Sequence, residues 1–141
     1  MPKLVIDNHE VEVPDGLKVI EAAEQIGIYI PRFCFHAELG AVGACRVCAV
    51  NVLEGPHTGI QMSCMLNVAD GMVVSTEDAE AADFRKHVIE WLMINHPHDC
   101  PVCDEGGHCL LQDLTVACGH GIRRYKGKKR TYHNQYLGPL I

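Results

Sequence analysis

The sequence has no apolar run that approaches the roughly 18–20 residues of a transmembrane helix. Its first residues lack a long apolar core followed by a small-residue cleavage site, so they predict no secretory signal. A G-x-G-x-x-G or Walker pattern is missing, and no nucleophile stands in evident register with a base. These absences argue against a membrane span, a nucleotide site and nucleophilic catalysis. They favour a reducing compartment, where clustered cysteines are more often metal ligands or redox groups than disulfides.

Acidic residues are missing after Asp113, although the chain holds 18 of them and a net charge of −6. Six of the 12 Lys and Arg residues lie in one segment, from Arg123 to Arg130. Such a segment can bind nucleic acid, or it can lie on an acidic surface of its own chain or of a partner. It has no heptads and no recognition-helix periodicity, which favours the acidic surface. Internal repeats and low-complexity runs are also absent.

The first half of the chain predicts a compact α+β unit. Strands are expected at 3–7, 10–13, 47–53 and 72–75, with a helix at 18–26 that ends at Gly27. The 141 residues fit one ordinary domain, or a small domain with an appendage.

The second half predicts two helices, at 77–95 and at about 109–118. Thr76 is the expected N-cap of the first, and Pro97 stops it. Phe84, Val88, Trp91 and Leu92 predict its buried face, with Trp91 in the core. The boundary between the two units is expected near residues 76–80.

Seven of the eight cysteines fall into two groups. The first group, Cys34, Cys45, Cys48 and Cys64, has the spacing C-x10-C-x2-C-x15-C. Glycines and small residues before Cys45 let the backbone wrap closely and aim N–H groups at sulfur, which suits an iron–sulfur cluster. The ten residues between the first two cysteines depart from the plant-type spacing of four. Structural zinc and a dithiol redox pair are the alternatives, but only Cys45 and Cys48 form a tight knuckle of the kind that zinc sites use twice.

The second group is His96, Cys100, Cys103 and Cys109, with the spacing H-x3-C-x2-C-x5-C. On spacing alone, a Cys3His zinc site and an iron–sulfur site both remain open. His96 is the best histidine candidate because it stands at a helix end with three residues of slack before Cys100. His98 lies too close to Cys100 and His108 abuts Cys109, so both are expected to support the site or face solvent. Gly106 and Gly107 allow the return that brings Cys109 back.

Three further residues, Cys118, His36 and His120, are interpreted as structural and not as metal ligands. Cys118 is expected to be a small core residue on a helix. His36 and His120 are expected at the surface or in packing.

The sequence resembles the N-terminal part of the large iron–sulfur subunit of NADH-quinone oxidoreductase, respiratory complex I, which is called the G subunit in bacteria. The segments that carry the resemblance to its 2Fe-2S ferredoxin-type domain are Pro31-Arg32-Phe33-Cys34, Gly43-Ala44-Cys45-Arg46-Val47-Cys48 and Met62-Ser63-Cys64. Those that resemble its His(Cys)3-ligated 4Fe-4S domain are Asn95-His96-Pro97-His98-Asp99-Cys100-Pro101-Val102-Cys103 and Gly106-Gly107-His108-Cys109-Leu110-Leu111-Gln112-Asp113. The basic segment is similar too, so the resemblance covers the whole chain.

The resemblance implies a β-grasp ferredoxin-like 2Fe-2S domain at 1–78, a small helical 4Fe-4S domain at 79–119, and an extended basic tail at 120–141. It implies one 2Fe-2S cluster on Cys34, Cys45, Cys48 and Cys64, and one 4Fe-4S cluster on His96, Cys100, Cys103 and Cys109. Family members continue into further domains, so we expect this chain to be a fragment.

The function implied is an electron relay inside a proton-translocating NADH:quinone oxidoreductase, from NADH and FMN toward quinone, with no substrate-converting site in this segment. The expected partners are other complex I subunits, including the one that binds FMN and NADH, and no nucleic acid. The location implied is peripheral, on the cytoplasmic side of the inner membrane. An electron-transfer subunit of a soluble NAD-linked hydrogenase or formate dehydrogenase is the first alternative, and a zinc-stabilised binding module is the second.

Overall fold

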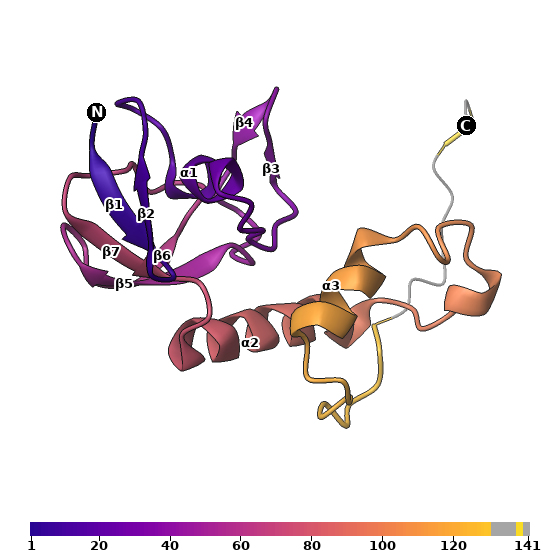
Figure 1. Ribbon diagram of the computed structural model, residues 1–141. Coiled ribbons are helices and arrows are strands. Elements are labelled where there is room, and N and C mark those ends of the chain that lie inside the picture. The colour runs from indigo at the N-terminus through magenta and orange to yellow at the C-terminus, as the bar shows by residue number, and fades with distance from the viewer. Residues whose placement is uncertain (131–137, 140–141) are drawn as a thin grey trace.

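The computed structural model describes residues 1–130 and 138–139 (Figure 1). A sheet-containing unit comes first, and helix α2 leads from its last strand to a smaller helical unit (Figure 1). The strands are β1 (Lys3–Ile6), β2 (His9–Glu12), β3 (Phe35–His36), β4 (Gly40–Ala41), β5 (Ala49–Glu54), β6 (Gly59–Met62) and β7 (Met72–Ser75). The helices are α1 (Val19–Gln25), α2 (Ala79–Asn95), the 3-10 turn η1 (Cys100–Val102) and α3 (Leu110–Cys118).

The main sheet has five strands in the order β2-β1-β7-β5-β6. β1 and β2 form an antiparallel hairpin whose turn residues, Asp7 and Asn8, both have positive φ, as a type I′ turn requires. β1 then pairs in parallel with β7, the last strand of the unit. This return of the chain to its first strand closes the unit.

Helix α1 packs against this sheet through Val19, Ile20, Ala22 and Ala23, which are fully buried in the larger apolar core. The helix ends where Gly27, with φ of 77°, leaves the helical region. The predicted strands and this helix are therefore confirmed to within two residues. Strand β6 and the short β3–β4 hairpin were not predicted.

Helix α2 begins two residues later than predicted, and its N-cap is Asp78 rather than Thr76. The Asp78 carboxylate accepts hydrogen bonds from the N–H groups of Glu80 and Ala81. Thr76 instead gives its hydroxyl and its N–H to the carboxylate of Asp7 in the first turn of the sheet. The prediction of Thr76 as the cap was wrong because its hydroxyl is hydrogen-bonded to Asp7, a residue far away in the sequence.

The buried face of α2 also differs from the prediction. Ala81, Arg85, Val88 and Ile89 are buried, which confirms the prediction for Val88 alone. Phe84, Trp91 and Leu92 are 37%, 68% and 43% exposed, so the prediction that they are buried was wrong. The guanidinium of Arg85 replaces the apolar contact expected on this face. It donates to the carbonyl oxygens of Ala49 and Thr76, both at 2.7 Å, and so fastens α2 to the sheet unit.

A second, smaller core joins the two units. Its buried members are Val47, Val88, Ile89 and Leu114, which come from the loop before β5, from α2 and from α3. Cys118 and Cys45 pack against it from the rim, which agrees with the structural role expected of Cys118. Through Val47, the loop that carries Cys45 and Cys48 thus packs against both helices.

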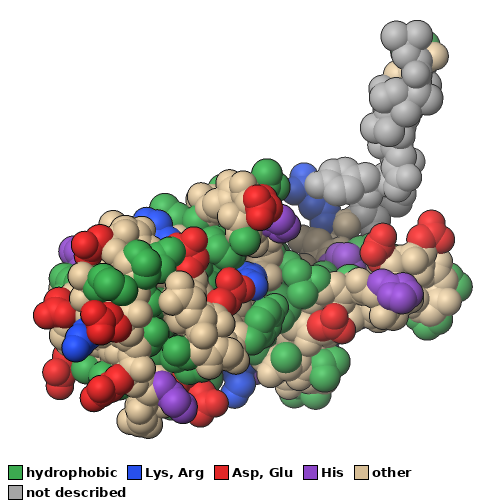
Figure 2. Space-filling view, turned by 45° about the horizontal axis from the view of Figure 1, so that its top comes forward, with side chains coloured by type: hydrophobic (Ala, Val, Ile, Leu, Met, Phe, Trp, Pro, Cys, Tyr) green, Lys and Arg blue, Asp and Glu red, His purple; other side chains and the backbone are tan. Residues whose placement is uncertain are grey.

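The segment 123–130 turns back toward α2. Arg124 donates to both carboxylate oxygens of Glu90, at 2.8 and 2.5 Å. The Arg130 N–H donates to the Asn95 side chain, and the Lys129 ammonium to the His96 carbonyl. Elsewhere, acidic side chains are spread over the sheet unit on the face drawn in Figure 2. The rest of the predicted tail, 131–137 and 140–141, lies outside the described residues.

The predicted fold class, an α+β ferredoxin-like unit followed by a helical unit, is confirmed. In the part of the chain that the structure describes, no helix combines the length and the apolar character that crossing a membrane requires.

Candidate metal centres

The first predicted ligand set comes together from three separate loops. Cys34 precedes β3, Cys45 and Cys48 lie before β5, and Cys64 follows β6. The sulfur atoms of Cys34 and Cys45 are 3.3 Å apart. The Cys64 thiol hydrogen-bonds with Cys48 and interacts electrostatically with the other three cysteines. The chain therefore presents four thiols at one place, as two close pairs.

Backbone geometry fixes the loop between Cys34 and Cys45. Gly43 has φ of 71°, which disfavours any residue with a side chain, and a Cβ there would lie 2.9 Å from the Met65 side chain, which would have to move. Arg46 also has positive φ, at 64°, a conformation unusual for a residue with a side chain. The Cys45 N–H donates to the Cys34 sulfur at 3.3 Å, which confirms that the loop aims N–H groups at sulfur.

Opposite electrostatic environments act on two of these cysteines. Partial burial opposes ionisation of Cys34, but the N–H and thiol of Cys45 and the N–H groups of Ala44 and Gly43 hold its pKa below the usual value. Burial raises the pKa of Cys64 to about 12, with the Cys48 hydrogen bond and the neighbouring sulfur charges adding to it. A cation bound among these thiols would reverse that second effect and release the proton.

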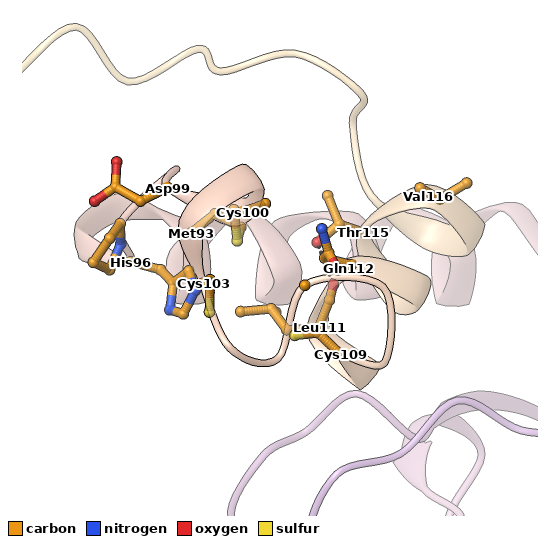
Figure 3. A pocket seen from close by; sticks show the side chains of 12 residues that line it. Met93, His96, Asp99, Cys100, Cys103, Cys109, Leu111, Gln112, Thr115 and Val116 are labelled. Atoms are coloured by element: carbon orange, nitrogen blue, oxygen red, sulfur yellow. Dashed lines mark hydrogen bonds between the residues drawn. The ribbon is translucent and has the colours of Figure 1, made fainter.

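The second set lines one cavity of about 320 Å³ (Figure 3). His96 is the C-cap of α2, Cys100 opens η1, Cys103 follows it, and Cys109 is the N-cap of α3. Figure 3 shows the three cysteine side chains reaching into the space between the loop and the start of α3. The two helices thus supply the ends of the set, and the turn between them supplies the middle.

The turn depends on Gly106 and Gly107. A Cβ on Gly106 would lie 2.5 Å from the Cys100 carbonyl oxygen, so no side chain fits there. Gly107 has φ of 90°, and its N–H donates to the Gln112 side chain at 2.9 Å. The predicted reason for the glycine pair, a sharp return toward Cys109, is confirmed.

His98 and His108 are exposed, and so are His96 and Cys103, so exposure does not distinguish the histidines of this segment. His36 is exposed too, and its ring accepts a hydrogen bond from the Glu38 N–H.

The distances between the ligand atoms distinguish a site for a single zinc ion from a site for an iron–sulfur cluster. Around one tetrahedral zinc ion, with bonds of about 2.3 Å, all sulfur atoms lie about 3.8 Å from each other. In neither set do three ligand atoms lie within 4.8 Å of one another. Ligands spread this widely fit a multi-iron core, in which they bind different iron atoms, better than a single zinc ion.

One group of potential ligands was missed by the sequence analysis. The structure gathers His87, Glu90 and His120, although His120 was expected only at the surface or in packing and the other two were not singled out. The three-residue spacing of His87 and Glu90 on one helix was the available signal.

Two family models match the chain. The model described as "2Fe-2S iron-sulfur cluster binding domain" matches residues 3–79, more than half of the sequence. The chain belongs to this 2Fe-2S cluster-binding family. A second model, "NADH-ubiquinone oxidoreductase-G iron-sulfur binding region", whose name specifies a 4Fe-4S cluster, matches residues 85–124. This member of the 2Fe-2S family therefore carries a 4Fe-4S binding region as well.

The whole length of this 2Fe-2S family member matches the N-terminal region of the G subunit of NADH-quinone oxidoreductase. It is 51% identical to the G subunits of Buchnera aphidicola and Escherichia coli K12, and 52% identical to that of Pseudomonas fluorescens. In each case the match covers 100% of this chain and 16% of the relative.

Among solved structures, the family member is similar to a chain of the NAD+-reducing NiFe-hydrogenase in its H2-reduced state. The TM-score is 0.82 at 31% identity, over 93% of this chain and 54% of the hydrogenase chain.

Proposed function

We propose that this chain is an electron-relay segment of the large iron–sulfur subunit of an NADH-quinone oxidoreductase. One observation carries the proposal: eight side chains from scattered positions gather at two places, each inside the range of an iron–sulfur family model. When bound, the two clusters supply one-electron redox chemistry. The chain itself holds them, sets their surroundings and converts no substrate.

The proposed ligands of the 2Fe-2S cluster are Cys34, Cys45, Cys48 and Cys64. The two close pairs support a division in which Cys34 and Cys45 bind one iron and Cys48 and Cys64 bind the other. The N–H groups that lower the pKa of Cys34 also favour the thiolate that iron needs.

The proposed ligands of the 4Fe-4S cluster are His96, Cys100, Cys103 and Cys109. Their common cavity and the exclusion of any side chain at Gly106 support this set. A neutral imidazole in place of a thiolate removes one negative charge, which raises the reduction potential when the surroundings are unchanged.

The proposed domain limits are 1–78, 79–119 and 120–141. The matched ranges of the two family models, 3–79 and 85–124, support the first division.

The proposed setting is a peripheral position on the cytoplasmic side of the inner membrane, within a proton-translocating complex. The partners would be its other subunits, including the one that binds NADH and FMN, and no nucleic acid. The contacts that segment 123–130 makes with α2 support a role for its basic residues within the protein.

The test is electron paramagnetic resonance of the anaerobically purified, reduced protein, with substitutions in each set. The unaltered protein should give the signals of one 2Fe-2S and one 4Fe-4S cluster. Cys64→Ser should remove the first signal and Cys103→Ser the second. His96→Cys should lower the potential of the 4Fe-4S cluster, whereas the control His98→Gln should leave it unchanged.

Two results would overturn the proposal. Colourless protein with stoichiometric zinc and no acid-labile sulfide would establish the zinc module instead. An unchanged potential in His96→Cys would exclude His96 as a ligand.

A soluble NAD-linked hydrogenase subunit is the second candidate, and the likeness to the hydrogenase chain favours it. Identity of 51% over the whole chain to the G subunits, against 31% to the hydrogenase, supports the first candidate. Genes for membrane-arm subunits beside the gene for this protein would support the quinone-linked complex. Hydrogenase genes there would support the alternative.

A further inference from the structure

Three side chains outside both cysteine sets converge beside α2. His87 and Glu90 are three residues apart on the helix and therefore lie on one side of it. His120 lies two residues after the end of α3. One ligand atom from each, a nitrogen of either histidine and a carboxylate oxygen, lie within 4.8 Å of one another. Among the described residues, no other three such side chains meet this closely.

The end of α3 brings His120 close to His87. A Cβ on Gly119 would lie 2.5 Å from the Thr115 carbonyl oxygen and 3.2 Å from the Ile89 side chain. The clash with the Thr115 carbonyl oxygen therefore requires glycine at the end of α3, and the next residue is His120. The rings of His87 and His120 then meet edge to face, with their centroids 5.2 Å apart.

Two of the three side chains are largely removed from solvent. Glu90 is 16% exposed and His120 is 17% exposed. The Nε2 atom of His120 is fully buried and has no hydrogen-bond partner, and it lies 3.7 Å from the nearer oxygen of Glu90. A buried ring nitrogen without a partner is rare and points to a missing ligand.

The hydrogen bond of His87 prepares its ring for a metal. Its Nδ1 lies 2.8 Å from the carbonyl oxygen of Asp83 and 3.4 Å from the Asp83 carboxylate. In the tautomer that carries its proton on Nδ1, the ring donates to that carbonyl oxygen. The lone pair of the neutral ring is then on Nε2. This arrangement, one nitrogen bound to a carbonyl and the other free, is typical of metal-binding histidines.

Arg124 also contacts this carboxylate, including the Oε2 atom that lies nearest His120. Its bonds to both Glu90 oxygens keep Glu90 ionised, which a metal ligand must be. The same guanidinium repels a cation, so it competes with a metal for Glu90.

We propose that His87, Glu90 and His120 form a zinc site, separate from the two iron–sulfur sites, which ties the segment after α3 to α2. Two imidazoles and one carboxylate are a known zinc donor set, with water at the fourth position. Ligand atoms around tetrahedral zinc lie about 3.3 Å apart at bonds of about 2 Å. Small side-chain rotations therefore close the present group on the ion.

The test uses the full chain with its iron–sulfur clusters loaded, so that the cysteines are already occupied. Titration calorimetry with zinc chloride should show one tight site per chain. His87→Gln and His120→Gln should each weaken it about ten-fold or more. The control His9→Gln, at an exposed position in the first hairpin, should bind zinc as the unaltered protein does.

Arg124→Gln should bind zinc more tightly, a gain that misfolding cannot produce. Cobalt(II) at the same site should show tetrahedral absorption bands without thiolate charge transfer. No zinc binding by the unaltered protein, equal affinity in both histidine variants, or cobalt bands that require thiolate would each overturn the proposal. Unchanged cluster spectra during the titration separate this result from that on the electron relay.

Discussion

At the scale of single residues, the first cysteine set combines a thiol that ionises easily with one that resists ionisation. Cys34 receives N–H groups from the loop, whereas Cys64 is buried beside other sulfur atoms. The sequence predicted that these residues share a site, because the glycine-rich loop and the C-x2-C pair are local signals. It could not predict their different pKa shifts, which depend on neighbours brought from three loops.

Cys64 makes the stability of the cluster-free protein fall at high pH. The folded state raises the pKa of this thiol from 9.0 to about 12, so it binds the proton more tightly than the unfolded chain does. The contribution is complete below pH 9.0 and is lost as the pH rises toward 12. Cys34 acts in the opposite sense, but its contribution is already complete above pH 9.0.

Urea unfolding of the chelator-treated protein at several pH values above 9.0 measures this slope. Cys64→Ala should flatten it. An equal slope in the variant would assign the effect to other groups.

Gly106→Ala should lower the occupancy of the second cluster and spare the first. The added methyl group meets the Cys100 carbonyl oxygen at 2.5 Å, so the turn that presents Cys100 and Cys103 must open. We expect occupancy of the 4Fe-4S site to fall on the order of ten-fold. Iron and sulfide analysis with paramagnetic resonance checks this, and Glu105→Ala, an exposed change in the same turn, is the control. Full occupancy in Gly106→Ala would show that the turn tolerates a side chain.

At the scale of elements, α2 shows which features local sequence signals predict and which they do not. Its length followed from the apolar repeat and Pro97. Its start did not, because Thr76 and Asp78 are both good N-caps and the choice rests on Asp7, far away in the sequence. Its buried face was predicted wrongly because it, too, depends on contacts with residues far away in the sequence. Arg85 is polar in the sequence, yet two distant carbonyl oxygens make it the inward residue.

Arg85→Met should therefore destabilise the protein despite replacing a charge with an apolar side chain. It removes two charge-assisted hydrogen bonds and leaves the carbonyl oxygens of Ala49 and Thr76 without that partner. The expected loss is about 3 kcal/mol of unfolding free energy. Urea denaturation measures it, with the exposed neighbour Lys86→Met as the control. A loss no larger than that of the control would mean that Arg85 does not fasten α2 to the sheet.

At the scale of the whole molecule, the two units are joined by the small core around Val47. The sequence predicted two units and a boundary, since their periodicities change near residue 76. It carried no sign that a residue between two proposed ligand cysteines of the first unit would be buried by α2 and α3. The convergence of His87 and His120 escaped prediction for the same reason, because it depends on how the two helices pack.

Val47→Ala tests this junction. Removing two buried methyl groups should lower the unfolding free energy by about 2 kcal/mol. Because Val47 stands between Cys45 and Cys48, the 2Fe-2S site should also lose cluster more readily when titrated with a chelator. Val116→Ala, at an exposed position of α3, should change neither quantity. Equal behaviour of the two variants would contradict a structural link between the units.

The position of Val47 also sets an order of events during synthesis. Its partner Val88 lies 41 residues later (88 − 47) and Leu114 lies 67 residues later (114 − 47). At roughly 5–20 residues per second, the ribosome adds that stretch in about 3–13 s. For those seconds Val47 lacks the side chains that later bury it, so the loop that carries Cys45 and Cys48 is less firmly held. We therefore expect the first metal site to be most open to loading before the second unit has emerged.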